Sequence, residues 1–237
     1  RDSGETYREM LKRMAEESGI ETPSADDLVR LDRARKGKKL SNADWVSRTD
    51  PDAKIMKRSN KGFDYCFNAQ AVVDSAHQII VAAETTAAAN DKQQAVPLSK
   101  AAVENLTAAG IELPRDAQGQ PQPIPNTADS GYFSEANVRD VTAAGLDPYY
   151  ATGRQKHHAP PEAPLTEPPG DVTESPKEAM SRKLRTESGR KLYAARKHIV
   201  EPVFGQIKRV RGFRKFLLRG LELVSAEWQL ICLTHNL

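Results

Sequence analysis

Six prolines between residues 157 and 176 place the strongest constraint on how this chain of 237 residues can fold. They are Pro160, Pro161, Pro164, Pro168, Pro169 and Pro176. Proline fixes one backbone torsion and lacks an amide hydrogen, so a segment this rich in proline suits neither a helix nor a central strand. We therefore predict a flexible Pro-rich linker over residues 157–180, with separate folded elements before and after it.

The chain before this linker alternates strand and helix patterns. Runs of β-branched and apolar residues indicate strands, and apolar residues at three- and four-residue spacing indicate helices. The predicted order is strand, strand, helix, strand, helix, strand, at residues 65–73, 79–85, 90–110, 124–128, 134–145 and 147–152. Asn90 and Ser134 can cap the helix starts, while Gly110 and Gly145 can close the helices. We therefore expect an α/β core over residues 49–156.

Residues 1–48 have a different pattern and are predicted to form a helical insertion or appendage. The first helix is marked by Tyr7, Leu11 and Met14, and Ser24 is placed to cap a second helix. This segment adds helices to the core and contributes no strand to it.

Charge is distributed unevenly along the chain. Residues 181–219 contain 13 Lys and Arg against two acids, whereas all other residues contain 22 against 30. The formal net charge of +3 hides this asymmetry. A basic block of this density usually faces a polyanion, and nucleic-acid phosphates are the first candidate. The alternative is a solvated helical face without a partner. Basic helices are predicted over residues 181–237.

Cysteine usage and hydropathy exclude several classes of protein. Cys66 and Cys232 lie far apart and form no Cys-x-x-Cys pair, so we expect two reduced core thiols. No apolar run is long enough to cross a bilayer, and the first residues lack a signal-peptide pattern. A soluble, intracellular protein is expected.

Three stretches of the chain resemble the catalytic core of bacterial insertion-sequence transposases of the DDE type. The first contains TDPDA at residues 49–53, NAQAVVD at 68–74 and IIV at 79–81. The second is ADSGY at residues 128–132, and the third is VEPVFGQIK at 200–208 with RGF at 211–213. Together they span most of the chain from residue 49 to residue 237, and the third is the most specific.

This resemblance implies an RNase H-like fold, a mixed sheet flanked by helices. One catalytic Asp would lie on the first strand, a second at the end of the fourth strand, and a Glu on a later helix. Asp129 and Glu201 match the second and third acids. The first strand with its Asp has no match and would lie upstream of Arg1, so the resemblance implies a fragment. We expect residues 65–152 to form one sheet with the carboxylates of Asp129 and Glu201 close together.

The chemistry implied by these acids is metal-dependent cleavage and strand transfer of DNA. Two Mg²⁺ (or Mn²⁺) ions would activate the nucleophile and stabilise the leaving oxygen. Such ions prefer oxygen ligands, so carboxylates from separate elements must converge. The alternative for Asp129 is a turn residue that bonds its own backbone. The alternative for Glu201 is an ion pair with Lys197, and Pro202 after it can kink or restart the helix.

A second group of residues resembles the Tyr-Arg-Glu-Lys signature of these transposases. Its members would be Tyr193, Arg196 and Lys208 around Glu201. The Arg-to-Glu interval is one residue longer than usual, so Lys197 is an alternative to Arg196. Together with the nearby cations, the candidates for binding double-stranded DNA at transposon ends and target sites are Tyr193, Arg196, Lys197, Lys208, Arg209, Arg211 and Arg214. A homodimer is expected in the complex with DNA.

Other acids in the chain are candidates to replace the missing first Asp. The expected strand directions favour Asp52 or Asp64 over Asp74, which suits a hairpin turn. Asp91, just inside an expected helix start, suits the positive end of the helix dipole. Trp228 fits a core position better than a base-stacking platform.

Three functions follow from these observations. The first is a DDE transposase in the bacterial cytoplasm, associated with the nucleoid, of which this chain is an incomplete and by itself inactive part. The second is a non-catalytic DNA-binding remnant of a transposase. The third is an RNA-binding or structural helical protein, which would have no divalent-ion site at Asp129 and Glu201.

Overall fold

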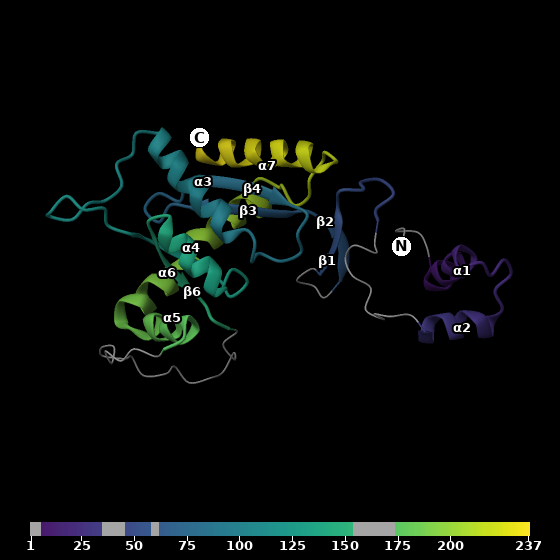
Figure 1. Ribbon diagram of the computed structural model, residues 1–237. Helices are drawn as coiled ribbons and strands as arrows, with labels where there is room; N and C mark the ends of the chain where they lie inside the picture. Colours follow the sequence, from purple (N-terminus) through teal and green to yellow (C-terminus); the bar gives the residue numbers. More distant parts are fainter. Residues whose placement is uncertain (1–5, 35–45, 58–61, 154–173) are drawn as a thin grey trace. The chain divides into compact units, whose positions relative to one another are not determined.

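The computed structural model describes residues 6–34, 46–57, 62–153 and 174–237 (Figure 1). The chain forms two compact units. The first unit comprises Arg1–Asn68, Thr86–Ala89 and Leu218–Val224, and the second comprises Ala69–Thr85, Asn90–Leu217 and Ser225–Leu237. Each unit is described separately below.

The first unit opens with the pair of helices predicted for residues 1–48. Helix α1 spans Tyr7–Glu17 and helix α2 spans Ala25–Ala34. The Ser24 hydroxyl accepts from the Asp27 amide (3.2 Å), so the predicted cap of the second helix is confirmed. A small buried cluster joins the two helices, formed by Met10, Leu11, Ala15 and Leu28.

An unpredicted hairpin follows in the first unit. Strand β1 (Lys54–Lys57) pairs antiparallel with β2 (Phe63–Cys66), with Lys54 opposite Cys66. The single strand predicted over residues 65–73 is therefore two strands, because the chain changes its partner at Phe67 and continues as β3 (Asn68–Val73). The cationic ends of β1 gave no strand pattern, which is why the sequence did not predict it.

The two acids of the TDPDA stretch have a structural role. The Gly220 amide donates to Asp50 Oδ2 (3.2 Å), and the Leu221 amide donates to Asp52 Oδ2 (2.9 Å). Leu221 is the first residue of helix α7 (Leu221–Asn236), so both carboxylates sit at the positive end of that helix. Asp52, considered above as a substitute catalytic acid, is a helix-capping residue.

The second unit contains the hairpin of β3 and β4 (Ile80–Thr86). Asp74 closes its turn: its carboxylate accepts from the amides of Ala76 (3.2 Å) and His77 (2.7 Å). The prediction that Asp74 is a turn residue is confirmed. Helix α7 lies along this hairpin (Figure 1), and a buried cluster joins the hairpin, α7 and the segment around residues 203–207. The cluster consists of Ile80, Val203, Ile207, Trp228, Ile231 and Cys232.

The second unit also contains a parallel strand pair joined by a helix. Strand β5 (Ile124–Ala128) pairs with β6 (Leu146–Tyr150) from Ile124 opposite Leu146 to Ala128 opposite Tyr150. Helix α4 (Glu135–Ala143) connects them, and the Ser134 hydroxyl accepts from the Asn137 amide (3.1 Å). The predicted strand, cap and helix are confirmed here.

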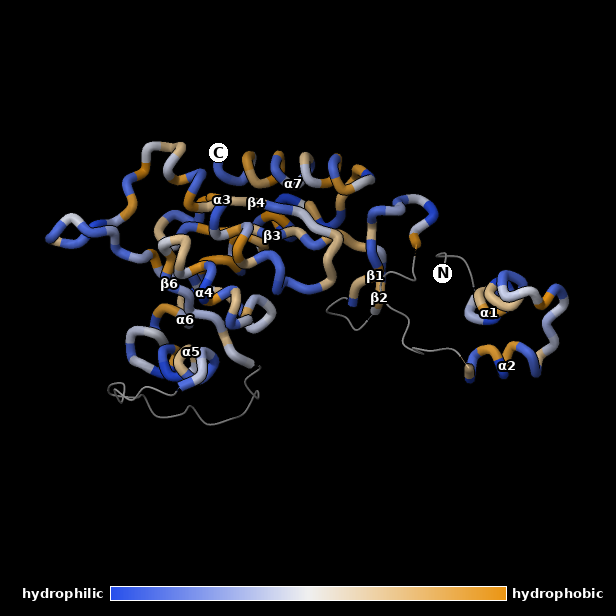
Figure 2. Tube along the Cα trace, in the orientation of Figure 1, coloured by the Kyte–Doolittle hydropathy of each residue, from blue (hydrophilic) through white to orange (hydrophobic). Residues whose placement is uncertain are grey.

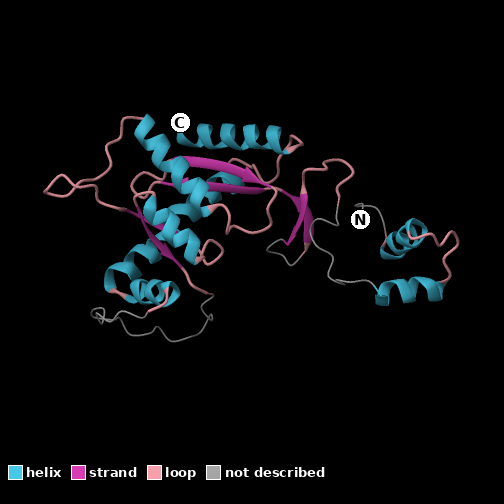
Figure 3. Cartoon of the chain, in the orientation of Figure 1, coloured by secondary structure: helices cyan, strands magenta, loops and turns pink. Residues whose placement is uncertain are grey.

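The prediction of one continuous sheet is wrong for the described residues. Their strands form three two-stranded sheets, β1–β2, β3–β4 and β5–β6 (Figure 3). Each pair joins strands that follow one another in the chain, by a loop or by helix α4. Hydrophobic periodicity identifies strands but carries no information on which strands pair, so most of the error lies in the pairing, together with the missed strand β1 and the division of residues 65–73 into β2 and β3. The α/β class is confirmed.

Two helix boundaries also differ from the prediction. Helix α3 spans Ala95–Ala108 and begins with no side-chain cap, so Asn90 does not start it. Helix α5 spans Pro176–Arg185, so residues 176–180 are helical and not linker. Pro176 is tolerated because the first helical position needs no amide hydrogen bond, and Ser175 and Glu178 form a capping box. The remainder of the predicted linker, residues 157–173, lies outside the described residues.

The last helices carry the basic block. Helix α6 spans Glu187–Gly205 and continues into a π-helical turn, η2 (Gln206–Val210). Trp228 and Cys232 are buried, with exposed fractions of 3% and 4%, which confirms the core positions predicted for them, whereas Cys66, predicted as the other core thiol, is only half-buried. Hydrophobic and hydrophilic residues alternate along α7 (Figure 2). No helix in the described parts of the chain combines the length and the apolar character needed to traverse a membrane.

We predict that Asp52→Ala lowers the free energy of unfolding by about 1 kcal/mol, because helix α7 loses a capping carboxylate. Asp52→Asn should cost less, since its side-chain oxygen can still accept from the Leu221 amide. Urea unfolding of both variants measures the difference. Equal loss in the two variants would show that charge alone, and not the hydrogen bond, holds the helix start.

Candidate functional site

Asp129 lies directly after strand β5, at the start of a tight turn. Its Oδ1 accepts from the Gly131 amide (2.8 Å), and its carbonyl accepts from the Tyr132 amide (3.2 Å). Asp129 therefore does bond its own turn, as the alternative to a metal ligand predicted, but with only one of its two carboxylate oxygens. The Asp129 side chain is exposed, and its Oδ2 makes no hydrogen bond among the described residues. One carboxylate oxygen thus fixes the turn while the other can act as a ligand.

A buried carboxamide connects this turn to strand β3. Gln70 is 3% exposed, and its Oε1 accepts from the Tyr132 hydroxyl. Its Nε2 donates to Asp91 Oδ1 (2.7 Å), and its carbonyl accepts from the Trp228 indole (2.9 Å). Nothing in the sequence predicts this role for Gln70, because a polar residue within a strand gives no signal of what it will contact.

A second carboxamide makes a parallel connection. Asn137 is buried, and its Nδ2 donates both to the Tyr132 carbonyl (2.7 Å) and to the Lys92 carbonyl (2.6 Å). Gln70 and Asn137 therefore both link the segment around Asp91 to the turn that begins at Asp129.

These links bring the Asp91 carboxylate close to Asp129. A Cβ atom added to Gly131 would lie 3.0 Å from Asp129 Oδ1 and 3.0 Å from Asp91 Oδ2. The two oxygens are therefore at most about 6 Å apart. Asp91 was expected to face the start of a helix, but α3 begins four residues later, and the carboxylate faces the turn instead. Nothing in the sequence placed these two acids together.

The pKa of Tyr132 reflects this environment. Burial raises the pKa of its phenol first, and the nearby charges of Asp91 and Asp129 raise it further. Both carboxylates disfavour the phenolate, because it would add a third negative charge. Tyr132 therefore stays protonated and continues to donate to Gln70 over the physiological pH range.

Glu201 lies on helix α6, which contacts strands β5 and β6. Its side chain is exposed, and it forms no ion pair with Lys197 among the described residues. The helix does not restart at Pro202. Proline cannot donate to the His198 carbonyl, and Gln78 Nε2 does so instead (2.9 Å), so α6 runs through to Gly205.

The expected closeness of Asp129 and Glu201 stays a prediction. Helix α6 contacts β5, the strand that ends beside Asp129, so the two elements that carry the acids touch. Within residues 6–34, 46–57, 62–153 and 174–237, no group of three or more His, Cys, Asp or Glu side chains could hold a metal ion.

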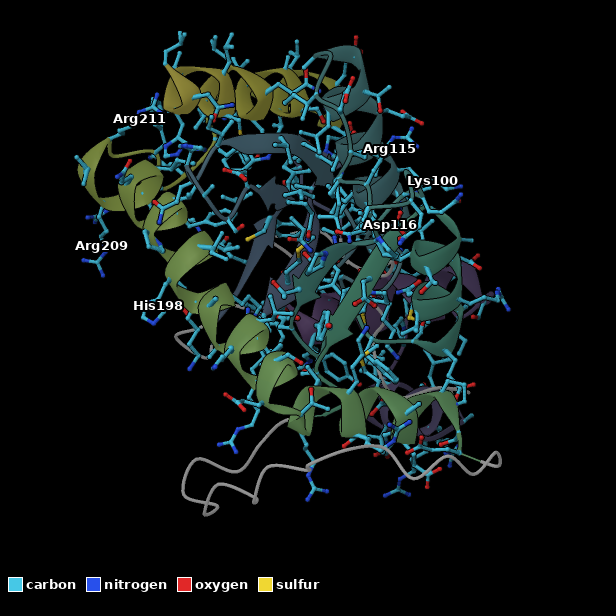
Figure 4. All side chains as sticks on the ribbon, turned by 90° about the vertical axis from the view of Figure 1, so that its left-hand side faces the viewer. Lys100, Arg115, Asp116, His198, Arg209 and Arg211 are labelled. Carbon is cyan, nitrogen blue, oxygen red and sulfur yellow. The ribbon has the colours of Figure 1, made fainter. Side chains whose placement is uncertain are left out.

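The candidate DNA-binding residues fall into two groups. Lys197, Lys208, Arg209 and Arg214 are exposed, whereas Tyr193, Arg196 and Arg211 are half-buried. Arg211 donates to the Ile231 carbonyl (3.0 Å) and to the Thr234 hydroxyl, so it anchors α7. In Figure 4, Arg209 points away from the fold while Arg211 lies beside α7.

Part of the positive charge in the basic block is paired internally. Lys183 pairs with Asp147, and Arg182 pairs with Glu174 (2.7 Å). The Arg196 guanidinium lies over the Tyr193 ring, 5.3 Å from its centre. The exposed cations on α6, on η2 and just after it are therefore those best placed to meet a polyanion.

The carboxy-terminal part of the chain matches a known family. Residues 167–237 match the family model described as Transposase DDE domain. This segment is similar to that family. The match confirms the resemblance seen in the sequence and includes Glu201 and Lys208, whereas Asp129 lies outside the matched residues. Comparisons with curated proteins and with solved structures gave no match. The family implies transposition in general terms, with DNA as the substrate.

We predict that Gly131→Ala separates the two carboxylates and lowers the free energy of unfolding by about 1 kcal/mol through overpacking. A methyl group 3.0 Å from both oxygens forces at least one of them to move. Gly205→Ala is the matched control, since its Cβ would meet no atom within 4 Å. Urea unfolding compares the two. A loss of stability as large in Gly205→Ala would contradict the crowding at Gly131.

We also predict that stability falls as pH rises from about 10 to 12. Burial raises the pKa of Tyr150 to about 12, whereas an unfolded tyrosine ionises near 10. The unfolded chain then loses protons that the native protein keeps, so the native state is disfavoured in this window and is unaffected below it. Tyr150→Phe and Tyr132→Phe should each flatten the decline measured by urea unfolding at pH 9 to 11. If the free energy of unfolding of both variants fell with pH as steeply as that of the wild type, the prediction would be contradicted.

Proposed function

We propose that this chain takes part in DNA transposition through metal-dependent cleavage and strand transfer at transposon ends. The observation that carries the proposal is an exposed carboxylate, Asp129, at the end of β5, next to a helix that bears Glu201 inside the matched transposase segment. Two acids in this arrangement suit phosphodiester chemistry better than they suit RNA binding or a purely structural role.

The side chains present fit a hard divalent cation. Asp129 offers an oxygen that is not used by its own turn, and Asp91 Oδ2 faces the same turn. Oxygen ligands of this kind hold Mg²⁺ or Mn²⁺, which when bound would activate the attacking oxygen and stabilise the leaving one. Asp129 and Glu201 would hold the ion, and Lys208, two helical turns after Glu201, would bind a phosphate beside it.

We propose that the exposed cations bind the backbone of double-stranded DNA. Lys197, Lys208, Arg209 and Arg214 meet this role, because each side chain is exposed. Tyr193 and Arg196 are half-buried and would contribute to the same surface, with the Arg196 guanidinium held over the Tyr193 ring. A homodimer on paired transposon ends and association with the bacterial nucleoid in the cytoplasm belong to the same proposal.

We further propose that the metal site is completed by a carboxylate from outside the described residues. No group of three metal-binding side chains lies together within those residues. Two carboxylates can attract Mg²⁺, but the acid that bridges both ions is then missing. A non-catalytic DNA-binding remnant is the second candidate function, since the exposed cations Lys197, Lys208, Arg209 and Arg214 would serve it without any metal site.

The DNA-binding proposal predicts a steep loss of affinity as salt rises. Each lost phosphate contact should reduce the slope of log K against log salt by about 0.9. The double variant Arg209→Gln/Arg214→Gln should therefore flatten the slope in fluorescence anisotropy. Lys100→Gln/Arg115→Gln is the matched control, because it removes the same charge from the opposite side of the view in Figure 4. If the slope of log K against log salt were the same for the two double variants, DNA would not bind at Arg209 and Arg214.

The catalytic proposal predicts that residues 1–237 alone bind DNA but do not cut it. A chain extended upstream to include an acidic strand should nick a transposon end when Mg²⁺ is present. Glu201→Gln in that longer chain should abolish nicking and leave DNA affinity largely intact, since the change keeps the shape and removes the charge. Parent-rate nicking by Glu201→Gln would remove Glu201 from the site. Robust cleavage by residues 1–237 would place the third carboxylate within this chain, with Asp91 as the first candidate.

A further inference from the structure

We propose that Gln70 is a positioning residue for Asp129: it holds the turn that presents the Asp129 carboxylate. The inference rests on the proposed role of Asp129 as a metal ligand. It goes beyond that role because it assigns a function to a buried residue on a different strand, which touches neither the metal nor DNA.

Both polar groups of the Gln70 side chain, the NH₂ group and the oxygen, form hydrogen bonds. A carboxylate can only accept hydrogen bonds, so Asp91 Oδ1 requires the NH₂ group of Gln70, at 2.7 Å. The carboxamide oxygen is thereby turned toward Tyr132, whose hydroxyl donates to it. Asp91 thus fixes the orientation of the amide, and the amide fixes the phenol.

Tyr132 transmits this constraint to Asp129 through the backbone. Its amide donates to the Asp129 carbonyl (3.2 Å), and the intervening Gly131 amide donates to Asp129 Oδ1 (2.8 Å). A displaced Tyr132 ring would pull on both bonds, because the turn contains only four residues. The carboxylate of Asp129 is exposed, so this turn is what sets its direction.

The position of Gln70 itself is fixed by the core. Its backbone carbonyl accepts from the buried indole of Trp228 (2.9 Å), and its side chain is 3% exposed. A buried carboxamide costs free energy unless it is hydrogen-bonded, so the arrangement with all partners satisfied is strongly preferred over alternatives. The chain of contacts therefore runs from the core of the unit to an exposed ligand, as outer partners of metal ligands commonly do.

The first measurement is amide hydrogen exchange at Gly131 and Tyr132 by NMR, in the absence of metal. Gln70→Met keeps the length of the side chain and removes both hydrogen bonds. It should raise exchange at these two amides about 10-fold. Tyr132→Phe, which removes only the hydroxyl, should do the same with little change in volume and remains informative if Gln70→Met folds poorly.

Asn236→Leu is the matched control. The Asn236 carboxamide also makes two hydrogen bonds within the second unit, with the amide and carbonyl of Ile80 (2.9 Å each), but it does not contact the turn. It should lower stability while leaving exchange at Gly131 and Tyr132 unchanged. Unchanged exchange in Gln70→Met and Tyr132→Phe, or an equal rise in Asn236→Leu, overturns the positioning role.

The second measurement is Mn²⁺ affinity by calorimetry. Gln70→Met should weaken binding about 10-fold, in the range found for outer partners of metal ligands, while Asn236→Leu binds as the wild type does. Wild-type affinity in Gln70→Met overturns the inference. Equal affinity in the wild type and Asp129→Asn instead overturns the proposed metal role of Asp129, and the exchange data distinguish this failure from the first.

Discussion

The hydrogen bonds of Gln70 connect the parts of the second unit on which the candidate site depends. Its carbonyl accepts from Trp228 on α7, its amide donates to Asp91 before α3, and its oxygen accepts from Tyr132 after β5. A buried polar side chain is stable only when each group has a partner, so these elements are constrained together. Asp129 begins the turn that Tyr132, one of these partners, completes.

The same logic applies to helix α6 and its catalytic candidate. Pro202 deprives the His198 carbonyl of its usual helical partner, and Gln78 in the β3–β4 turn supplies a substitute. Gln78 adopts a left-handed backbone conformation (φ 59°) within this tight turn, and from there its side chain reaches the His198 carbonyl. The helix stays continuous beside Glu201 and leads directly into η2, which carries Lys208 and Arg209.

Some cations of this protein form contacts within the fold, and others are exposed and available for the proposed contact with DNA. Arg211, Lys183 and Arg182 use their charge within the fold, through α7, Asp147 and Glu174 respectively. Arg209 and Arg214 are exposed and carry the proposed contact with DNA. A count of cations along residues 181–219 cannot separate these uses, because both give the same sequence pattern.

The sequence by itself determined most of the helices and strands and the resemblance of its carboxy-terminal segment to DDE transposases. The strand ending at Asp129, the helix capped by Ser134 and the buried face of α7 follow from local propensity, capping and periodicity, and the motif around Glu201 identified the transposase segment. Only the tertiary structure decided strand pairing, the capping role of Asp52 and the meeting of Asp91 with Asp129 across Gly131. These features depend on contacts between residues far apart in the chain, and local sequence carries no record of which distant partner a backbone or a side chain will find.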